Sequence, residues 1–267
     1  MERLPQVEPD VLVRLAIDAG RAAGQLLLDH QTGIRQAATK SSPTDPVTEA
    51  DRAAEQVIVA AIRAARPEDA VCAEEGTDLS GTTGLRWVID PLDGTVNYLY
   101  QRRGWVVSIA IEDAAGALIG VVLDPIHGEV IHAVRGHGAY LGQQRLRVND
   151  PVTSAIALVG TGFSYTLDAR RRQAHLLTEL LPAVRDIRRT GTCAGDLCAL
   201  ATGRMDAFLE DELSPWDWAA GALIAREAGA VVTPMRADTT NPGLLAAGPA
   251  LHPELYRLID PLTPEEP

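Results

Sequence analysis

The chain is poor in aromatic residues and cysteine, and it has no long apolar run. Phe, Trp and Tyr make up only 4% of its 267 residues, so its core must consist mostly of Ala, Val, Leu and Ile. Its three cysteines, Cys72, Cys193 and Cys198, form no C-x-x-C pair and no even disulfide set. No stretch is long and apolar enough for a membrane span, and the N-terminus lacks a signal-peptide pattern. We therefore expect a reduced, cytoplasmic protein.

Positive charge is also scarce. The chain has 24 Lys and Arg against 36 Asp and Glu, a net charge of −12, which argues against a general nucleic-acid surface. Hydrophobic residues make up 46% of the sequence, enough for a sizeable core and too many for wholesale disorder. The length suits one large domain or two smaller ones. We expect one compact unit whose halves, 1–150 and 151–267, join near residue 150.

The spacing of apolar residues in the first half changes near residue 70. Before that point a 3.6-residue period predicts two helices, and after it short apolar runs separated by turn residues predict strands. The last three of these strands should form an antiparallel meander, and a further hairpin strand should follow before residue 148. The predicted helices are 10–29 and from about 48, on either side of a polar loop at 33–46, and the strands are 71–73, 86–89, 105–111, 118–123 and 130–134.

The second half shows strand patterns alternating with helix patterns. Such alternation predicts an α/β layer. The predicted strands are 156–159, 186–189, 206–210, 231–233 and 244–247, and the predicted helices are 168–181, 193–202, 216–228 and 253–259.

The most informative stretch is Trp-Val-Ile-Asp-Pro-Leu-Asp-Gly-Thr-Val-Asn-Tyr at 87–98. Its apolar start predicts a buried strand that stops at Asp90, because Pro91 has no N–H to donate. Asp90 and Asp93 then lie close together on a tight turn, where a cation between them would offset their repulsion.

The residues after these two aspartates suit an anion. Gly94 lets the backbone approach a ligand closely, and a helix starting at Thr95 would present free N–H groups to a phosphate. A D-x-x-D-G motif on its own is more often a polar loop with two solvated aspartates. The rest of the chain has to decide between these readings.

Three further acids lie where ligands often gather. Glu74 follows the strand at 71–73, and Asp51 and Asp217 lie in the first turns of predicted helices. Taken singly, Asp51 and Asp217 suit helix caps and Glu74 suits a solvated surface. Taken together, they would converge with Asp90 and Asp93 if these strand and helix ends face one cleft.

These motifs resemble the inositol monophosphatase family, within the wider fructose-1,6-bisphosphatase-like fold. The resemblance covers roughly residues 10–250 and rests on ordered motifs of high specificity. It implies an α+β protein with a layered αβαβα sandwich of the sugar-phosphatase type, with an antiparallel sheet in the first half and a mixed α/β layer in the second. One departure is Ala73, where the family usually has Gly. The matching segments are 40–51, Ala73-Glu74-Glu75, Asp90-Pro91-Leu92-Asp93-Gly94-Thr95-Val96-Asn97-Tyr98 and Trp216-Asp217-Trp218-Ala219-Ala220-Gly221.

The resemblance also implies a set of metal ligands. It assigns two to three Mg²⁺ ions, with Mn²⁺ as a substitute, and places Lys40 in a loop near the weaker third ion; by itself Lys40 would be an ordinary exposed lysine. An all-oxygen donor set without His or Cys agrees, because it favours a hard ion over Zn²⁺. The implied ligands are Glu74, Asp90 and the Leu92 carbonyl for the first ion, Asp90, Asp93 and Asp217 for the second, and Glu74 again for the third.

Catalytic and substrate-binding roles follow from the same resemblance. Thr95 and Asp51, helped by Glu74, would polarise a water that a metal ion activates for in-line attack on a phosphate monoester. Glu210 would hydrogen-bond an inositol hydroxyl, although by itself it suits a surface strand end, and Cys193 stands where the family commonly has Ala. The implied substrate-binding residues are Asp93, Gly94, Thr95, Cys193, Glu210 and Asp217.

The leading hypothesis is a Mg²⁺-dependent, Li⁺-sensitive phosphatase that converts myo-inositol monophosphate to inositol and phosphate. Asn97 in the first motif favours this branch over nucleotide-bisphosphate relatives. A related phosphatase acting on histidinol phosphate, fructose 1,6-bisphosphate or a nucleotide phosphate is the main alternative. A regulatory binding protein on the same scaffold is a further one. We expect a small-molecule phosphate ester as the partner, a homodimer by family resemblance, and neither nucleic acid nor membrane.

Overall fold

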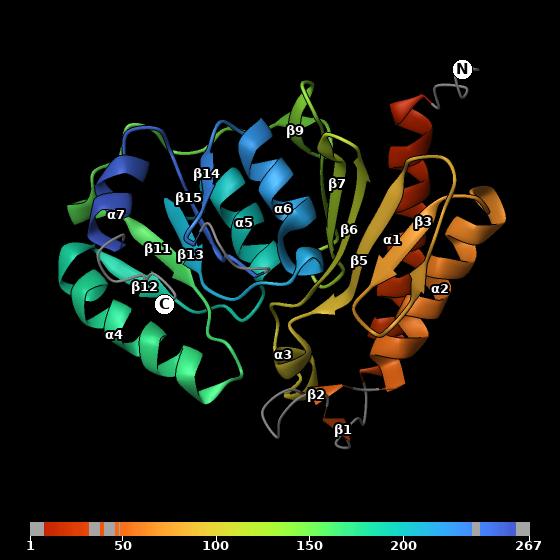
Figure 1. Cartoon of the computed structure of the whole chain (residues 1–267), viewed down its shortest axis with the longest axis horizontal. Helices are drawn as coiled ribbons and strands as arrows, with labels where there is room; N and C mark the ends of the chain where they lie inside the picture. The colour runs from red at the N-terminus through yellow and green to blue at the C-terminus, as the bar shows by residue number, and fades with distance from the viewer. Residues whose placement is uncertain (1–7, 32–37, 40–45, 48, 237–240, 260–267) are drawn as a thin grey trace.

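The computed structural model describes residues 8–31, 38–39, 46–47, 49–236 and 241–259. Its helices and strands form five layers, with two outer helical layers, two sheets and a helical layer between the sheets (Figure 1). Four clusters of buried apolar residues fill the spaces between successive layers. This is the αβαβα sandwich that the sequence resemblance implies.

The first outer layer consists of α1 (Pro9–His30) and α2 (Glu49–Ala65), close to the helices predicted from the apolar period. Both helices pack their apolar faces against one side of the first sheet. The buried face of α2 also carries two acids one turn apart, Asp51 and Glu55. None of the helices in the described part of the chain combines the length and apolar character that a membrane span requires.

The first sheet has eight strands in the order β10-β9-β8-β7-β6-β5-β3-β4. The predicted meander over β6, β7 and β8 is confirmed, and every neighbouring pair is antiparallel except β3 with β5, which is parallel. A separate two-stranded ladder joins β1 (Ala38–Thr39) and β2 (Pro46–Val47). The strands of the large sheet are β3 (Ala70–Ala73), β4 (Asp78–Leu79), β5 (Arg86–Asp93), β6 (Val106–Asp113), β7 (Gly116–Asp124), β8 (Glu129–Val134), β9 (Gly138–Leu141) and β10 (Gln144–Arg145).

Strand β5 does not stop at Asp90, so that prediction was wrong. It continues to Asp93 and pairs with β6 through Asp90 opposite Ser108 and Asp93 opposite Val106. Asp90 and Asp93 are three residues apart on β5, whereas their partners on β6 are two residues apart. The extra residue on β5 forms a β-bulge. Pro91 lies within this bulge, where the missing N–H costs no ladder bond.

The middle layer consists of α5 (Cys193–Ala201) and α6 (Pro215–Glu227), with the short α3 (Thr95–Leu99) at the edge of the first sheet (Figure 1). One side of α5 and α6 packs against the first sheet and the other side against the second. The layer brings the N-termini of α5 and α6 to the turn that follows β5.

The second sheet has five strands in the order β12-β11-β13-β15-β14. Strand β11 pairs in parallel with β12 and β13, whereas β15 is antiparallel to β13 and β14, so this is the mixed layer that was expected. The first predicted strand of this half begins later than expected, because 154–156 forms a 3₁₀ turn. The strands are β11 (Leu158–Thr161), β12 (Asp186–Arg188), β13 (Ala207–Glu210), β14 (Val231–Pro234) and β15 (Leu244–Ala247), and α4 (Leu167–Ala183) and α7 (His252–Ile259) form the second outer layer.

Candidate active site

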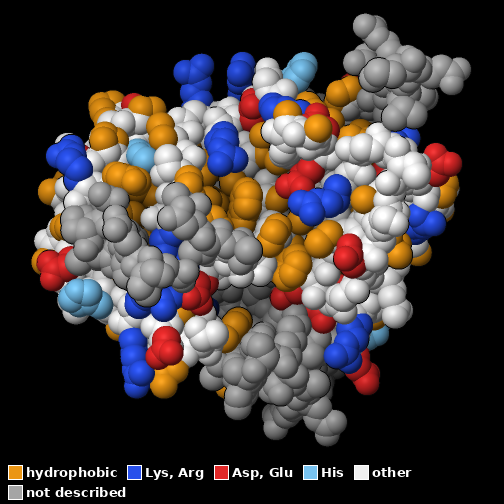
Figure 2. Space-filling model, viewed as in Figure 1, with side chains coloured by type: hydrophobic (Ala, Val, Ile, Leu, Met, Phe, Trp, Pro, Cys, Tyr) orange, Lys and Arg blue, Asp and Glu red, His pale blue; other side chains and the backbone are white. Residues whose placement is uncertain are grey.

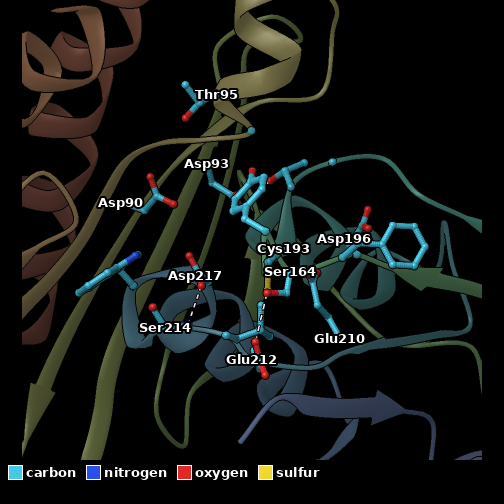
Figure 3. A pocket seen from close by; sticks show the side chains of 18 of the residues that line it. Asp90, Asp93, Thr95, Ser164, Cys193, Asp196, Glu210, Glu212, Ser214 and Asp217 are labelled. Carbon is cyan, nitrogen blue, oxygen red and sulfur yellow. Dashed lines mark hydrogen bonds between the residues drawn. The ribbon is translucent and has the colours of Figure 1, made fainter. Parts of the chain in front are cut away.

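Strands and helices from both halves of the chain meet at one pocket of about 280 Å³. Acidic side chains from β5, β13, α6 and the turn after β3 line it, and Figure 3 shows Asp90, Asp93 and Asp217 on one side with Glu210 and Glu212 on the other. The predicted site residues that line the pocket are Glu74, Asp90, Leu92, Asp93, Gly94, Thr95, Cys193, Glu210 and Asp217. Lys40 lies outside the described residues.

The pairing of β5 explains why three acids meet at one edge of the sheet. Strands β3 and β5 are parallel with Ala73 opposite Ile89, so Glu74 and Asp90 leave the same end side by side. Residues three apart on a regular strand would point to opposite faces. The bulge brings Asp90 and Asp93 to the same face of the sheet. Their partners on β6 are two residues apart, and residues two apart on a strand share a face.

The carboxylates of this turn carry charge that burial disfavours. Burial, followed by the negative charges of three neighbouring carboxylates, raises the pKa of Asp90 well above its usual range. Burial also raises the pKa of Asp93 to about 6, although hydrogen bonds from the Thr192 hydroxyl and the Ala194 N–H oppose the shift. These two bonds, 2.5 and 2.7 Å long, both end on Oδ2 of Asp93 and tie the turn to the start of α5.

Asp217 performs the capping role predicted for it and lines the pocket as well. It is the third residue of α6, and its Oδ2 accepts the Ser214 N–H at 2.6 Å in a capping box (Figure 3). Burial raises the pKa of Asp217 well above its usual range, and the charges of Glu74 and Asp93 add to the shift. The helix start therefore holds a fourth carboxylate against the acids of the first sheet.

Thr95 begins α3 and contacts the buried Asp51 of α2. The Thr95 hydroxyl lies 3.0 Å from Oδ1 of Asp51 and 3.2 Å from the Leu92 carbonyl oxygen. Gly94 precedes it with a φ of 102°, a conformation open to glycine, and any Cβ there would lie 2.8 Å from the Gly104 carbonyl oxygen. The backbone can make this turn only with glycine at position 94.

The opposite end of the pocket combines acids with one cation. Burial raises the pKa of Glu210 to about 8, and the negative charge of Asp93 is the next largest cause. The positive charge of Arg189 opposes the shift. Burial similarly raises the pKa of Asp196 to about 7, although the Thr190 hydroxyl donates to it. Among the described residues that line the pocket, Arg189 is the only Lys or Arg.

Cys193 is buried in the wall at this end of the pocket. Burial and nearby acids raise the pKa of its thiol well above the usual range, so it presents a neutral surface instead of a thiolate nucleophile. Cys72, Cys193 and Cys198 are all free thiols, as predicted.

The donor chemistry of the first end fits a hard divalent cation. Four carboxylates and the Leu92 carbonyl supply only oxygen, and burial followed by neighbouring negative charge raises the pKa of Asp90 and of Asp217. Within the described ranges, no three acidic, His or Cys side chains stand around one common point as a closed metal cage. The fit therefore rests on the donor set and its charge.

The whole arrangement matches one protein family. A model of the inositol monophosphatase family covers residues 8–263. The chain belongs to this family.

Relatives and solved structures agree with that membership. The inositol-1-monophosphatase SuhB of Mycobacterium tuberculosis (strain H37Rv) is 41% identical over 85% of this chain and 82% of its own length. The Nus factor SuhB of Escherichia coli (strain K12) is 37% identical over 83% of this chain and 84% of its own length. The crystal structure of extragenic suppressor protein suhB from Bartonella henselae has a TM-score of 0.88 and 33% identity, covering 93% of this chain and 98% of its own.

Sequence reasoning missed one acid that supports the site of this inositol monophosphatase family member. Glu55 is only 5% exposed, and its carboxylate accepts the Glu75 N–H at 2.7 Å. It also accepts the Thr77 N–H at 3.1 Å and the Thr77 hydroxyl at 2.5 Å. Glu55 therefore fixes the turn that carries Glu74. A signal was present, because Glu55 follows Asp51 by four residues on the apolar face of α2.

Asn97 also proves to be a positioning residue. Its buried side-chain amide donates to the Gly104 carbonyl at 2.6 Å and to the Thr190 carbonyl at 2.7 Å. These bonds hold the start of α3 against the segment that leads into α5. The two halves of the pocket are thus joined close to Asp93 and Thr95.

Proposed function

We propose that this protein hydrolyses myo-inositol monophosphate to inositol and phosphate in a reaction that requires Mg²⁺. One observation carries the proposal: Glu74, Asp90, Asp93 and Asp217 converge in one pocket beside the Thr95–Asp51 pair. Family membership supports a phosphatase, and the geometry provides the groups that such a reaction needs.

The four carboxylates and the Leu92 carbonyl would hold the metal. Bound there, Mg²⁺ would supply Lewis-acid chemistry, lowering the pKa of a water and neutralising charge on the phosphoryl group. The chain's own contribution is to hold these five oxygen-bearing groups where the ends of β3 and β5 meet the start of α6. The bonds from Thr192 and Ala194 restrain Asp93 so that the turn keeps its shape when substrate enters.

Thr95 and Asp51 would orient the attacking water. When the Thr95 hydroxyl donates its hydrogen bond to Asp51, its lone pairs are left to accept a hydrogen bond from water. Asp51 is fully buried, so this orientation is fixed by the protein and not by solvent. The backbone N–H groups at the start of α3 have no acceptor within the helix and would hold the phosphate oxygens.

The other end of the pocket would bind the inositol ring. Glu210 can accept or donate a hydrogen bond to a hydroxyl, depending on its protonation, and the neutral thiol of Cys193 gives the ring a surface without charge. Acids and hydroxyls dominate this end, which suits a polyol better than a large apolar group.

The name of the E. coli relative supports a second candidate. That protein is named Nus factor SuhB, a name that refers to no hydrolysis. A binding role for this chain on the same scaffold is therefore the alternative to catalysis. Phosphate release by the purified protein would separate the two, because a binding role alone predicts none.

Three further properties complete the proposal by family resemblance. We expect inhibition by Li⁺, a homodimer and a cytoplasmic setting. Figure 2 shows a band of hydrophobic side chains across the middle of one face, and a second copy of the chain could pack on such a surface. Analytical ultracentrifugation would test the dimer, and a single monomeric species at micromolar concentration would reject it.

The test of the proposed function is phosphate release from a panel of esters at equal concentration. The panel contains myo-inositol 1-phosphate, histidinol phosphate, fructose 1,6-bisphosphate and adenosine 2′-phosphate, each with Mg²⁺, with Mn²⁺, and with Mg²⁺ plus Li⁺. We expect the highest kcat/KM for the inositol ester, no phosphate release without a divalent ion, and inhibition by Li⁺. A preference for any other ester would overturn the proposed substrate.

A further inference from the structure

Two loops form the wall of the pocket on the side opposite the proposed metal-binding acids. The loop at 162–166 follows β11 and the loop at 211–214 follows β13, and these strands are parallel neighbours in the second sheet. Both loops therefore leave the same edge of the sheet. Ser164 and Glu212 lie against each other in this wall (Figure 3).

Glu212 joins the two loops through its carboxylate. Oε2 accepts the Ser164 hydroxyl at 3.1 Å and lies 3.5 Å from the Thr166 hydroxyl. Oε1 forms an ion pair with Arg172 in the first turns of α4. A single side chain thus holds the 162–166 loop, the 211–214 loop and α4 together.

The residues behind Glu212 extend this connection. Asp211 pairs with Arg236 at 2.8 Å and with Arg172 at 3.6 Å. The buried Gln173 accepts the Ser164 N–H at 2.9 Å, so α4 holds the same loop a second time. Asp211 and Glu212 are thus paired with two arginines, and the wall is a cross-linked structure.

Glu212 occupies a backbone conformation that does not suit it. Its φ is 60°, and among the described non-glycine residues only Gln101 shares a positive φ. Glycine would adopt this conformation without strain. A glutamate held here, with both carboxylate oxygens engaged, points to a role for its side chain in place of a backbone requirement.

The wall is also packed directly on Glu210. A Cβ added to Gly162 would lie 2.1 to 2.2 Å from the Glu210 carboxylate atoms, so that carboxylate lies across the backbone of the loop. Any shift of the 162–166 loop would therefore change the position of Glu210. The turn at Asp93–Thr95 belongs to different elements, and the three atoms nearest to a Cβ on Gly162 all belong to Glu210.

We infer that Glu212 is a specificity-determining positioning residue for the proposed phosphatase. By clamping the 162–166 loop on Glu210, it presets the pocket for a compact polyol that hydrogen-bonds Glu210. Esters whose leaving group offers no hydroxyls gain little from this arrangement. The inference rests on the proposed function and adds a residue that distinguishes polyol phosphates from other esters.

The test compares two esters in two variants. For each protein, kcat/KM is measured for myo-inositol 1-phosphate and for p-nitrophenyl phosphate, whose leaving group has no hydroxyl besides the one esterified. Glu212→Gln cannot accept from both Ser164 and Arg172, and Glu212→Gly removes the carboxylate while suiting the positive φ. We expect the ratio of the two kcat/KM values to fall about tenfold in both variants, mainly through a higher KM for the inositol ester.

The controls separate clamping from folding and from charge. Glu179→Gln removes an exposed acid from the same helix as Arg172 and should leave the ratio unchanged. Loss of folded protein lowers both kcat/KM values equally and does not move the ratio. An active wild type with an unchanged ratio in both Glu212 variants overturns this inference alone. A wild type inactive on every ester overturns the proposed function and this inference with it.

Discussion

The two ends of the pocket balance their acids in opposite ways. At the end built by β5, α6 and the turn after β3, none of the described pocket-lining residues is Lys or Arg, and burial followed by neighbouring negative charge raises the pKa of Asp90 and of Asp217. At the end built by the loops after β11 and β13, Arg172 and Arg236 pair with the acids of the wall, and Arg189 lies beside Glu210. Under the proposed function the first end would bind a cation from solution, whereas the second end contains arginines of its own.

This difference assigns separate tasks to the two ends. Under the proposed function the acids of the first end would hold a metal ion and a phosphoryl group, so the first end would determine the reaction. A wall whose charges are already paired has a fixed shape, so the second end determines which ester fits. Substitutions at the first end should therefore affect kcat and metal affinity, and those at the second end should affect selectivity.

The largest effect is expected for Asp93→Asn. Removing this ligand should lower Mg²⁺-dependent kcat by about a thousandfold, since metal stabilisation of the transition state is worth several kcal/mol. The asparagine oxygen can still accept from Thr192 and Ala194, so the fold should remain. Steady-state assays with circular dichroism as the folding control test this. Near-wild-type turnover in a folded variant would contradict the metal assignment.

Thr95→Val should have the next largest effect. Valine keeps the shape of the side chain but can neither accept a hydrogen bond from water nor donate one to Asp51, and kcat should fall about a hundredfold or more with KM little changed. Asp51→Asn should produce a similar loss, and the double variant should be no worse than the poorer single one. Additive losses in the double variant would show that the two residues act separately.

Glu55→Gln should weaken metal binding without touching a ligand. The amide nitrogen of glutamine would face a backbone N–H or a hydroxyl that now donates a hydrogen bond to Glu55. The turn that carries Glu74 would therefore loosen. We expect the Mg²⁺ concentration for half-maximal activity to rise about ten- to a hundredfold, as for other supports of metal ligands. Terbium luminescence gives an independent readout of affinity. Unchanged Mg²⁺ dependence would make Glu55 a purely structural residue.

Much of the first end could be predicted from sequence because local chemistry dictates it. The apolar run before it placed Glu74 directly after a strand, and the helix period placed Asp51 and Asp217 in first turns. Family resemblance then joined these separated segments. The β-bulge was missed, because Pro91 predicts the end of a strand equally well. Only the pairing with β6 shows that the strand resumes.

The second end was harder to predict because it depends on contacts between distant segments. Glu212 and Arg172 are forty residues apart and join only through the packing of α4 against the strand loops. Asp196 resembles an ordinary acid in the first turn of a helix until its burial is known. Neither residue type nor spacing carries that information, since a surface ion pair and a clamp have the same sequence signature.

A last effect, on stability and not on catalysis, is expected as a function of pH through Asp196. Its pKa is raised to about 7 by burial, so the folded protein binds a proton that the unfolded chain has lost above its ordinary pKa near 4. The free energy of unfolding should therefore fall between pH 5 and pH 7, by up to about 3 kcal/mol from this group. Asp196→Asn should flatten that slope in urea titrations at both pH values. Equal slopes would show that Asp196 is not protonated in the folded protein.

The most direct test of the central claim is calorimetric titration of the purified protein with Mg²⁺, compared with its Asp93→Asn variant. The claim is that the buried carboxylates of the β5 turn bind the cation on which hydrolysis depends. We predict saturable Mg²⁺ binding by the wild type, and affinity at least tenfold weaker in the variant. Equal affinity in the two proteins, or no binding by the wild type up to millimolar Mg²⁺, would contradict the account.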